Sequence, residues 1–409
     1  MSTSEERPLR ILAADDSAVM RSILWKLFLL QKEDRSSELP RMELCAIARD
    51  GVECLEQVKQ LRPDVLVLDL EMPRLNGLEV LDRLRLDNSD LPVIMCSAYT
   101  EHGARSTLEA LARGASDYVT KPAGQRDFDA AMQSLSQQLL PRIAALAKNP
   151  RGKEKTAARG ASSGNSPHAK FEEIPSKASS PIEVVVIGLS TGGPSALEQL
   201  LPKLPKDFPV PVLIVQHMPK LFTGALAERL DKCCALRVEQ AYDNATIRPG
   251  TVWLAPGDAH MEIAPRRAMA GEEDRGAAVC SARVRLHQQE PLNHCRPSVD
   301  YLFFSAARMY GAGTLALVMT GMGADGLNGA RVVHDRGGVV LVQDEATSAV
   351  WGMPGRVSAA GIASATLPLW SIAGALKQRV SEGRPARFEA VAPAASAMAP
   401  RREMTHGLL

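Results

Sequence analysis

The chain of 409 residues contains two series of short runs rich in Val, Ile and Leu, and amphipathic stretches separate the runs within each series. Strand-length apolar runs that alternate with helix-length stretches are typical of parallel sheets covered by helices. A segment rich in Lys, Ala, Gly and Ser, residues 148–181, lies between the two series. Because this segment has too little apolar surface to repay its ordering, the sequence predicts two α/β domains joined by a flexible linker.

The fold class that we predict is two doubly wound parallel-sheet domains. The first domain, residues 8–126, has five expected strands, at 10–14, 44–48, 65–68, 93–96 and 118–120. A helix and the flexible linker are expected at 127–181. The second domain, residues 182–381, has strand candidates in the runs EVVVIG, VPVLIVQ, TVWLAP, TLALVMT and GGVVLVQ. The pattern of residues 261–287 predicts a hairpin with an extended loop. The tail at 382–409 is rich in Ala, Pro and Arg, and we expect it to be disordered.

Composition and charge exclude several classes of function. The net charge is +1, so the whole chain has no electrostatic reason to bind nucleic acid or an anionic membrane. The start MSTSEERP is polar and no apolar run reaches membrane-spanning length, which favours a cytoplasmic protein without direct membrane insertion. The seven cysteines include no C-x-x-C pair, and we expect reduced thiols.

Charged residues follow three expected strands of the first domain. Asp15 and Asp16 follow the first strand, Asp69 ends the third, and Lys121 follows the fifth. Since open α/β sheets build their sites at the carboxyl ends of strands, we expect these groups to meet. Clustered carboxylates suit Mg²⁺, and a nearby lysine can neutralise a phosphoryl group. The alternative is that each acidic residue only caps a helix or starts a turn.

Residues 9–125 resemble a two-component response-regulator receiver domain, which has a flavodoxin-like fold. The segments ADDS, LDLEMPRLNG, MCSA and DYVTKP stand in the family's order. The resemblance implies that a chemotaxis histidine kinase phosphorylates Asp69. It implies a Mg²⁺ site made by Asp16, Asp69 and the Glu71 backbone carbonyl, supported by Asp15. It also implies the switch residues Ser97, Tyr118 and Lys121.

A candidate nucleophile lies at the start of the second domain. The segment EVVVIGLSTGGPSAL places Ser190 in a G-x-S-x-G spacing between an expected strand and helix, which is typical of a nucleophile elbow, although such a serine can also be only a helix cap. His217 follows the next strand and Asp325 follows a later one, so the two could complete a Ser-His-Asp triad. This chain order differs from the Ser, Asp, His order of α/β-hydrolases.

The segment around Asp325 supports a rival interpretation. Gly321, Gly323 and Gly326 form a G-x-G-x-x-G pattern after an apolar strand, which is the spacing of a dinucleotide-binding fingerprint. Asp325 lies inside this pattern, where its negative charge would face a bound pyrophosphate. The acidic residue therefore argues against a nicotinamide or flavin site.

Residues 182–381 resemble the catalytic domain of the chemotaxis protein-glutamate methylesterase family. The matching segments are IGLSTGGP, VQHMP, LAPGDAHM, HCRPSVDYLF, MTGMGADG and QDEATSAVWGMPG. The resemblance implies Ser190 as nucleophile, His217 as general base and then general acid, and Asp325 as the orienting carboxylate. It also implies oxyanion stabilisation by the Met322 amide and the Thr191 hydroxyl.

This resemblance implies an α/β serine methylesterase that hydrolyses glutamate methyl esters on methyl-accepting chemoreceptors under the control of phosphorylation. Glutamine deamidation is expected too, because both reactions pass through one acyl-enzyme. No cofactor is expected for catalysis, and Mg²⁺ serves receiver phosphorylation. The alternative from another class is a non-catalytic output module that docks a partner. Two features depart from the family pattern: Leu189 replaces an alanine, and the loop at 266–278 is long.

Overall fold

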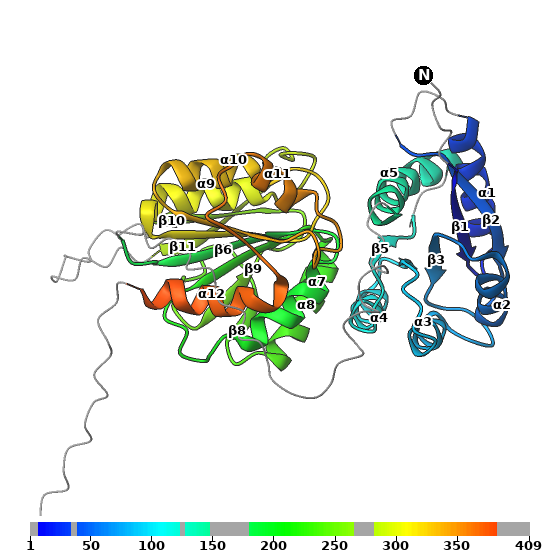
Figure 1. Ribbon diagram of the computed structural model, residues 1–409, viewed down its shortest axis with the longest axis horizontal. Coiled ribbons are helices and arrows are strands. Elements are labelled where there is room, and N and C mark those ends of the chain that lie inside the picture. The colour runs from blue at the N-terminus through cyan, green and yellow to red at the C-terminus, as the bar shows by residue number, and fades with distance from the viewer. Residues whose placement is uncertain (1–6, 34–38, 123–126, 148–179, 266–281, 383–409) are drawn as a thin grey trace, which may run out of the picture.

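The structure is a computed structural model that describes residues 7–33, 39–122, 127–147, 180–265 and 282–382 (Figure 1). Residues 148–179 of the predicted linker, most of the predicted tail and the long loop at 266–278 lie outside the described residues. Among the described helices, none is both long enough and apolar enough to cross a membrane.

The first domain is a five-stranded parallel sheet covered by helices on both faces. Its strands are β1 Leu9–Ala14, β2 Met42–Ala48, β3 Val65–Asp69, β4 Val93–Ser97 and β5 Asp117–Thr120, in the order β2-β1-β3-β4-β5. Helices α1 Ala18–Glu33 and α5 Phe128–Ala147 pack on one face. Helices α2 Gly51–Leu61, α3 Gly77–Leu86 and α4 Glu101–Ala112 pack on the other. All five predicted strands are confirmed.

Local sequence explains where the helices of this domain begin. The Asp50 side chain accepts from the Val52 and Glu53 amides and starts α2. Asn76 and Glu79 form a capping box at α3, and these contacts satisfy amides that would otherwise have no partner. The caps therefore fix the residues at which α2 and α3 begin.

The second domain is a seven-stranded parallel sheet. Its strands are β6 Val184–Leu189, β7 Val212–Gln216, β8 Arg237–Gln240, β9 Thr251–Leu254, β12 Thr314–Val318, β13 Val339–Gln343 and β14 Ala365–Leu367, in the order β14-β13-β12-β6-β7-β9-β8. The five predicted runs are strands. Sequence reasoning missed β8 and β14, because these short edge strands have few buried apolar residues.

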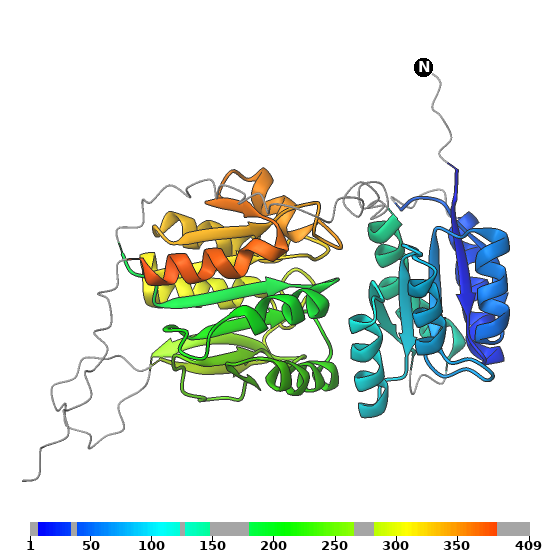
Figure 2. The ribbon, with the colours of Figure 1, turned by 60° about the horizontal axis from the view of Figure 1, so that its bottom comes forward.

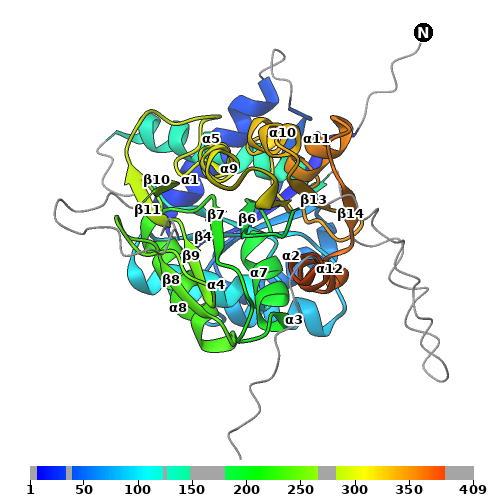
Figure 3. The same ribbon diagram turned by 90° about the vertical axis from the view of Figure 1, so that its left-hand side faces the viewer.

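Two helical layers cover this second sheet (Figure 3). Helices α7 Gly193–Leu200, α8 Lys220–Cys233 and α12 Leu369–Ser381 lie on one face, with the 3₁₀ turn η1 Leu201–Lys203 after α7. On the other face lie α9 Val299–Tyr310, α10 Leu327–Asp335 and α11 Met353–Ala359, with the 3₁₀ turn η2 Gly311–Gly313. The predicted hairpin is confirmed: β10 His260–Pro265 pairs antiparallel with β11 Ala282–His287. The predicted fold class of two parallel-sheet α/β domains is correct.

The two domains are in direct contact, and α4 and β5 of the first domain face α7 and α8 of the second (Figure 2). The Tyr118 ring stacks on the Phe222 ring with centroids 4.7 Å apart and planes 10° apart. Ser195 Oγ donates to the Leu111 carbonyl at 3.1 Å, and Arg105 pairs with Glu228 at 3.5 Å. The contact therefore combines a buried aromatic stack with polar contacts around it.

Candidate functional site

The predicted acidic site forms at the carboxyl edge of the first sheet. Lys121 Nζ lies 2.9 Å from Asp15 Oδ2 and 2.7 Å from Asp69 Oδ2. Oxygens of Asp15, Asp16 and Asp69 lie within 4.8 Å of one another. Asp15 and Asp69 are buried whereas Asp16 is exposed, so the cluster opens to solvent on one side.

Charge in this site is only partly balanced. Burial and the neighbouring Asp15 charge raise the pKa of Asp69 to about 6, although Lys121 opposes the change. Burial disfavours the Lys121 ammonium, but its hydrogen bond and ion pair with Asp69 raise the pKa of Lys121 overall. Three carboxylates against one ammonium leave excess negative charge, and oxygen donors in this number fit a hard cation such as Mg²⁺. The Glu71 side chain is exposed, whereas its backbone forms a hydrogen bond with Asp69.

The two predicted hydroxyl-bearing switch residues occupy different surroundings. Ser97 ends β4, is buried, and donates through Oγ to the Gly103 carbonyl at 3.1 Å. Tyr118 lies in β5 with its ring against Phe222 of the second domain. Tyr118 therefore links the sheet that carries Asp69 to the second domain.

Ser190 lies at a tight turn between β6 and α7. Its amide donates to the Thr320 carbonyl at 3.0 Å, and its carbonyl accepts from Gly193 at 2.8 Å. Gly192 has φ +77°, and a Cβ there would lie 2.4 Å from the Ala349 Cβ, so this position requires glycine for both reasons. Among the described residues, no side chain or carbonyl is hydrogen-bonded to the Ser190 hydroxyl.

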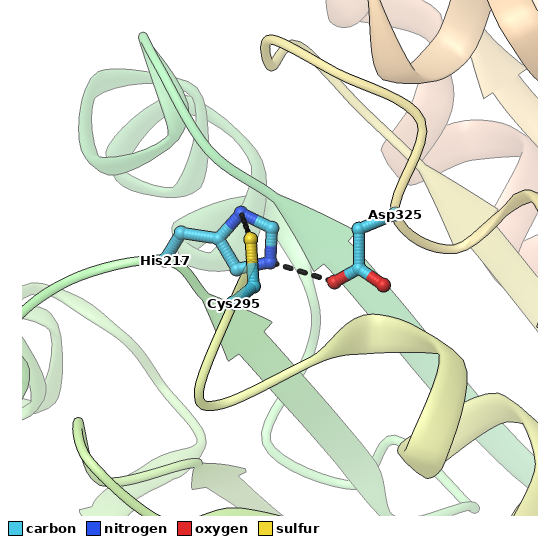
Figure 4. A group of neighbouring side chains, drawn as sticks. All are labelled: His217, Cys295 and Asp325. Carbon is cyan, nitrogen blue, oxygen red and sulfur yellow. Dashed lines mark hydrogen bonds and ion pairs between the residues drawn. The ribbon is translucent and has the colours of Figure 1, made fainter. Parts of the chain in front are cut away.

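His217 and Asp325 are brought together by neighbouring strands. His217 follows β7 and Asp325 follows β12, and both strands pair with β6, which precedes Ser190. His217 Nε2 lies 2.8 Å from Asp325 Oδ2, as Figure 4 shows. This contact assigns the proton to Nε2 and leaves Nδ1 as the basic nitrogen. Burial favours neutral imidazole, but the hydrogen bond to Asp325 and the nearby Cys295 outweigh it and raise the pKa of His217.

Asp325 is held by a dense set of donors. Its carboxylate accepts from Ser298 Oγ and the Val299 amide, both at 2.7 Å, and from Asn293 Nδ2 at 2.8 Å. Burial disfavours the carboxylate, but its hydrogen bonds with His217 and these donors lower the pKa of Asp325 overall. The side chain is 2% exposed, so Asp325 is a fixed, ionised partner for the imidazole.

The glycines of the G-x-G-x-x-G pattern have structural roles around this pair. A Cβ at Gly321 would lie 2.8 Å from the Ser190 Cβ, so glycine allows the loop to approach the serine. Gly323 and Gly326 adopt φ +88° and +89°, which favour glycine. The glycines thus shape the loop that carries Asp325 and lies against Ser190.

Both predicted oxyanion residues contact the first domain. Thr191 is buried, and its Oγ1 donates to Asp117 Oδ2 at 2.7 Å. Asp117 also pairs with Arg142 Nε at 3.1 Å. Met322 packs against an apolar cluster formed mainly by α1, α5 and the sheet of the first domain. In this arrangement the Thr191 hydroxyl is already used by a carboxylate of the first domain.

Sequence reasoning missed several residues that hold this site. Gln216 Nε2 donates to the Ser190 carbonyl at 2.9 Å, and Asn293 and Ser298 bind Asp325. Cys295 Sγ lies 3.7 Å from His217 Nδ1. The segment HCRPSVDYLF is a sequence signal for this region, but its spacing alone does not indicate which side chains reach His217 and Asp325.

Comparison with known proteins identifies both halves of the chain. A model of the CheB methylesterase family matches residues 185–376, and a model of the response regulator receiver domain matches residues 11–133. The protein-glutamate methylesterase/protein-glutamine glutaminase of Trichodesmium erythraeum is 40% identical over 371 residues, which are 91% of this chain and 99% of that protein. The protein of the same name from Nocardioides sp. is 42% identical over 388 residues, 92% of this chain and 97% of that protein.

Solved structures of parts of such proteins are also similar. The crystal structure of the Thermotoga maritima CheB methylesterase catalytic domain is 40% identical, covers 49% of this chain and 99% of that chain, and has a TM-score of 0.44. The response regulator domain of Thermotoga maritima CheB is 39% identical, covers 34% of this chain and 94% of that chain, and has a TM-score of 0.29.

Proposed function

Because the chain belongs to the protein-glutamate methylesterase/protein-glutamine glutaminase family and carries a receiver domain ahead of its catalytic domain, we propose that it hydrolyses glutamate methyl esters on methyl-accepting chemoreceptors through Ser190, His217 and Asp325. The observation that carries the proposal is the 2.8 Å contact between His217 and Asp325 beside the tight turn of Ser190. The cytoplasmic helices of the receptors are the substrate, and a chemotaxis histidine kinase is the phosphodonor.

The ester is cleaved in two half-reactions. Ser190 Oγ attacks the ester carbonyl while His217 Nδ1 takes the hydroxyl proton, and His217 then returns that proton to the departing methoxide, which leaves as methanol. Water attacks the acyl-enzyme with the same base, which releases the glutamate carboxylate and regenerates Ser190. Asp325 stays ionised and stabilises the imidazolium. At glutamine sites, ammonia leaves instead of methanol, and the second half-reaction is the same.

Developing negative charge on the carbonyl oxygen is stabilised by the Met322 amide and the Thr191 hydroxyl. In the docked arrangement Thr191 donates to Asp117 instead, and that carboxylate would repel an oxyanion. The receiver therefore inhibits in two ways: it covers the rim of the site at Met322, and it occupies one donor of the oxyanion hole.

Phosphorylation of Asp69 relieves this inhibition. Asp16, Asp69 and the Glu71 carbonyl would hold Mg²⁺ with Asp15 in support, and this ion would supply the charge neutralisation that phosphoryl transfer needs. Lys121 and Ser97 then bind the phosphoryl oxygens, and Tyr118 moves inward. Since Tyr118 stacks on Phe222 and its neighbour Asp117 binds Thr191, a movement of β5 disrupts both contacts at once.

The proposal is tested by measuring methanol release from methylated receptor membranes, with and without a small-molecule phosphodonor and Mg²⁺. The expected result is a slow basal rate, a faster rate with the phosphodonor, and none with Ser190→Ala. Methanol release by Ser190→Ala equal to that of the native chain would exclude the proposed nucleophile. Absence of release from the native chain under every condition would favour a non-catalytic module.

A further inference from the structure

A buried histidine outside the triad contacts the start of α9. His260 begins β10, which packs against α9 (Figure 3), and its side chain is 0% exposed. Its Nδ1 accepts a hydrogen bond from the Ser298 amide at 3.2 Å, and its Nε2 lies 3.2 Å from the Glu290 carbonyl oxygen. The proposed esterase mechanism gives this histidine no role.

These two contacts fix the protonation of the imidazole. The Ser298 amide can only donate and the Glu290 carbonyl can only accept, so Nδ1 carries the lone pair and Nε2 carries the proton. Burial lowers the pKa of His260, although its hydrogen bond with the Glu290 backbone opposes the change. The ring is therefore neutral at neutral pH, in the one tautomer that satisfies both neighbours.

Ser298 precedes α9 but does not cap its own helix. Its hydroxyl donates to Asp325 instead, at 2.7 Å. The first two amides of the helix, those of Val299 and Asp300, donate to the same carboxylate at 2.7 and 3.4 Å. Asp325 therefore takes the place of the N-cap side chain of α9, where the positive end of the helix dipole favours its negative charge.

The position of Asp325 therefore depends on where α9 begins. These three donors belong to consecutive residues, so they move together with the start of the helix. His260 holds that start through the buried amide of Ser298. Because a buried amide without a partner is unfavourable, loss of this acceptor would shift the turn before α9 and the donors that it carries.

Two aromatic neighbours hold the imidazole in this orientation. The rings of Tyr301 and His287 pack on the His260 ring, with centroids 4.3 and 5.2 Å away. Because the His260 side chain is fully buried, it cannot touch a substrate. Any effect of His260 on the reaction must therefore pass through Ser298 and Asp325.

We propose that His260 is a positioning residue of the esterase: through the Ser298 amide it fixes the start of α9, and thereby Asp325. This role rests on the proposed function, because His260 acts on ester hydrolysis only through the pair of His217 and Asp325. If Asp325 shifts, His217 loses its ionised partner at 2.8 Å, and both the orientation and the basicity of the imidazole change.

Two substitutions separate the two contacts of His260. In His260→Asn, the side-chain carbonyl can take the place of Nδ1 and accept from the Ser298 amide. In His260→Gln, the side-chain amide can reach the Glu290 carbonyl from the place of Nε2, but no acceptor remains at the δ position. Methanol release from methylated receptor membranes is measured for both full-length variants with a phosphodonor and Mg²⁺, well below their unfolding midpoints.

His260→Gln should lower kcat about 100-fold with little change in KM, since a misplacement of about 1 Å can cost that much and His260 does not touch substrate. His260→Asn should recover most of this loss. The matched control is His334→Gln, the same change at an exposed histidine of α10, and it should keep the native rate. A native kcat in His260→Gln would overturn the proposal. Equal losses in both His260 variants would overturn it too, because the Nδ1 contact would then not be the one that matters.

A second readout is independent of activity. Nuclear magnetic resonance of the chain labelled with ¹⁵N-histidine follows the titration of His217 and reports the tautomer of His260. The His217 pKa should fall in His260→Gln and stay near its native value in His260→Asn, whereas a merely structural role would leave it unchanged in the folded chain. In the native chain, a proton on His260 Nδ1 would also overturn the proposal, because that nitrogen could not accept from Ser298.

The outcomes distinguish this inference from the proposed function. If the His217 pKa falls in His260→Gln but the native chain releases no methanol under any condition, His260 positions Asp325 and the esterase function fails. If the native chain releases methanol and neither kcat nor the His217 pKa changes in His260→Gln, the esterase function stands and the positioning role is wrong.

Discussion

Asp117→Ala should convert the inhibited enzyme into one with high basal activity. The substitution removes the carboxylate that accepts from Thr191 Oγ1 at 2.7 Å across the domain contact. A hydrogen bond to a charged group contributes about 1.5–3 kcal/mol, and about 1.4 kcal/mol changes an equilibrium tenfold. The docked state should therefore become less favourable by about 10- to 100-fold relative to the open state.

The assay compares methanol release with and without a phosphodonor. The phosphodonor-stimulated rate should stay close to that of the native chain, because Asp117 plays no part in the open site. The basal rate should rise towards the stimulated rate, so the ratio of the stimulated rate to the basal rate should fall. Removing Asp117 also takes away the ion-pair partner of Arg142 Nε.

The matched control is Asp82→Ala, which removes the same charge from the receiver at an exposed pair with Arg113. Exposed ion pairs contribute about 0–1 kcal/mol, and both of these side chains stay exposed to solvent with the two domains in contact, so the basal rate should not change. A basal rate in Asp117→Ala equal to that of Asp82→Ala would refute the idea that the Asp117–Thr191 bond restrains the enzyme.

Three further predictions concern the two sites. Ser190→Ala should reduce ester hydrolysis by about 10⁴- to 10⁶-fold in steady-state methanol assays, with an unchanged unfolding midpoint; activity above a tenth of the native rate would contradict this. Asp69→Asn should keep the basal rate and lose stimulation by a phosphodonor with Mg²⁺, and persistent stimulation would place the phosphoacceptor elsewhere. Because His217 must be neutral to act as base, its raised pKa means that kcat/KM increases with pH. Asp325→Asn should move this rise to lower pH and reduce the plateau, and an unmoved pH profile would exclude the coupling.

Local sequence determined much of this protein. The apolar runs predicted the five strands of the receiver and the central strands of the catalytic domain, because buried parallel strands need uninterrupted apolar residues. Local sequence also identified four residues at strand ends: Asp69, Ser190, His217 and Asp325. Such residues converge at the carboxyl edge of a parallel sheet. Short edge strands such as β8 escaped detection, since pairing with a neighbour stabilises them more than their own pattern does.

Tertiary structure decided what those residues contact. A turn far along the chain decides which nitrogen of His217 contacts Asp325 and places the Cys295 thiol beside the same ring. The bond between Asp117 and Thr191 and the stack of Tyr118 on Phe222 depend on how two independently patterned surfaces fit together. Hydrophobic periodicity specifies which face of an element is buried, but it carries no information about which surface of another domain covers a site. Shape and charge complementarity between folded domains determine that contact, and they exist only after both sheets have formed.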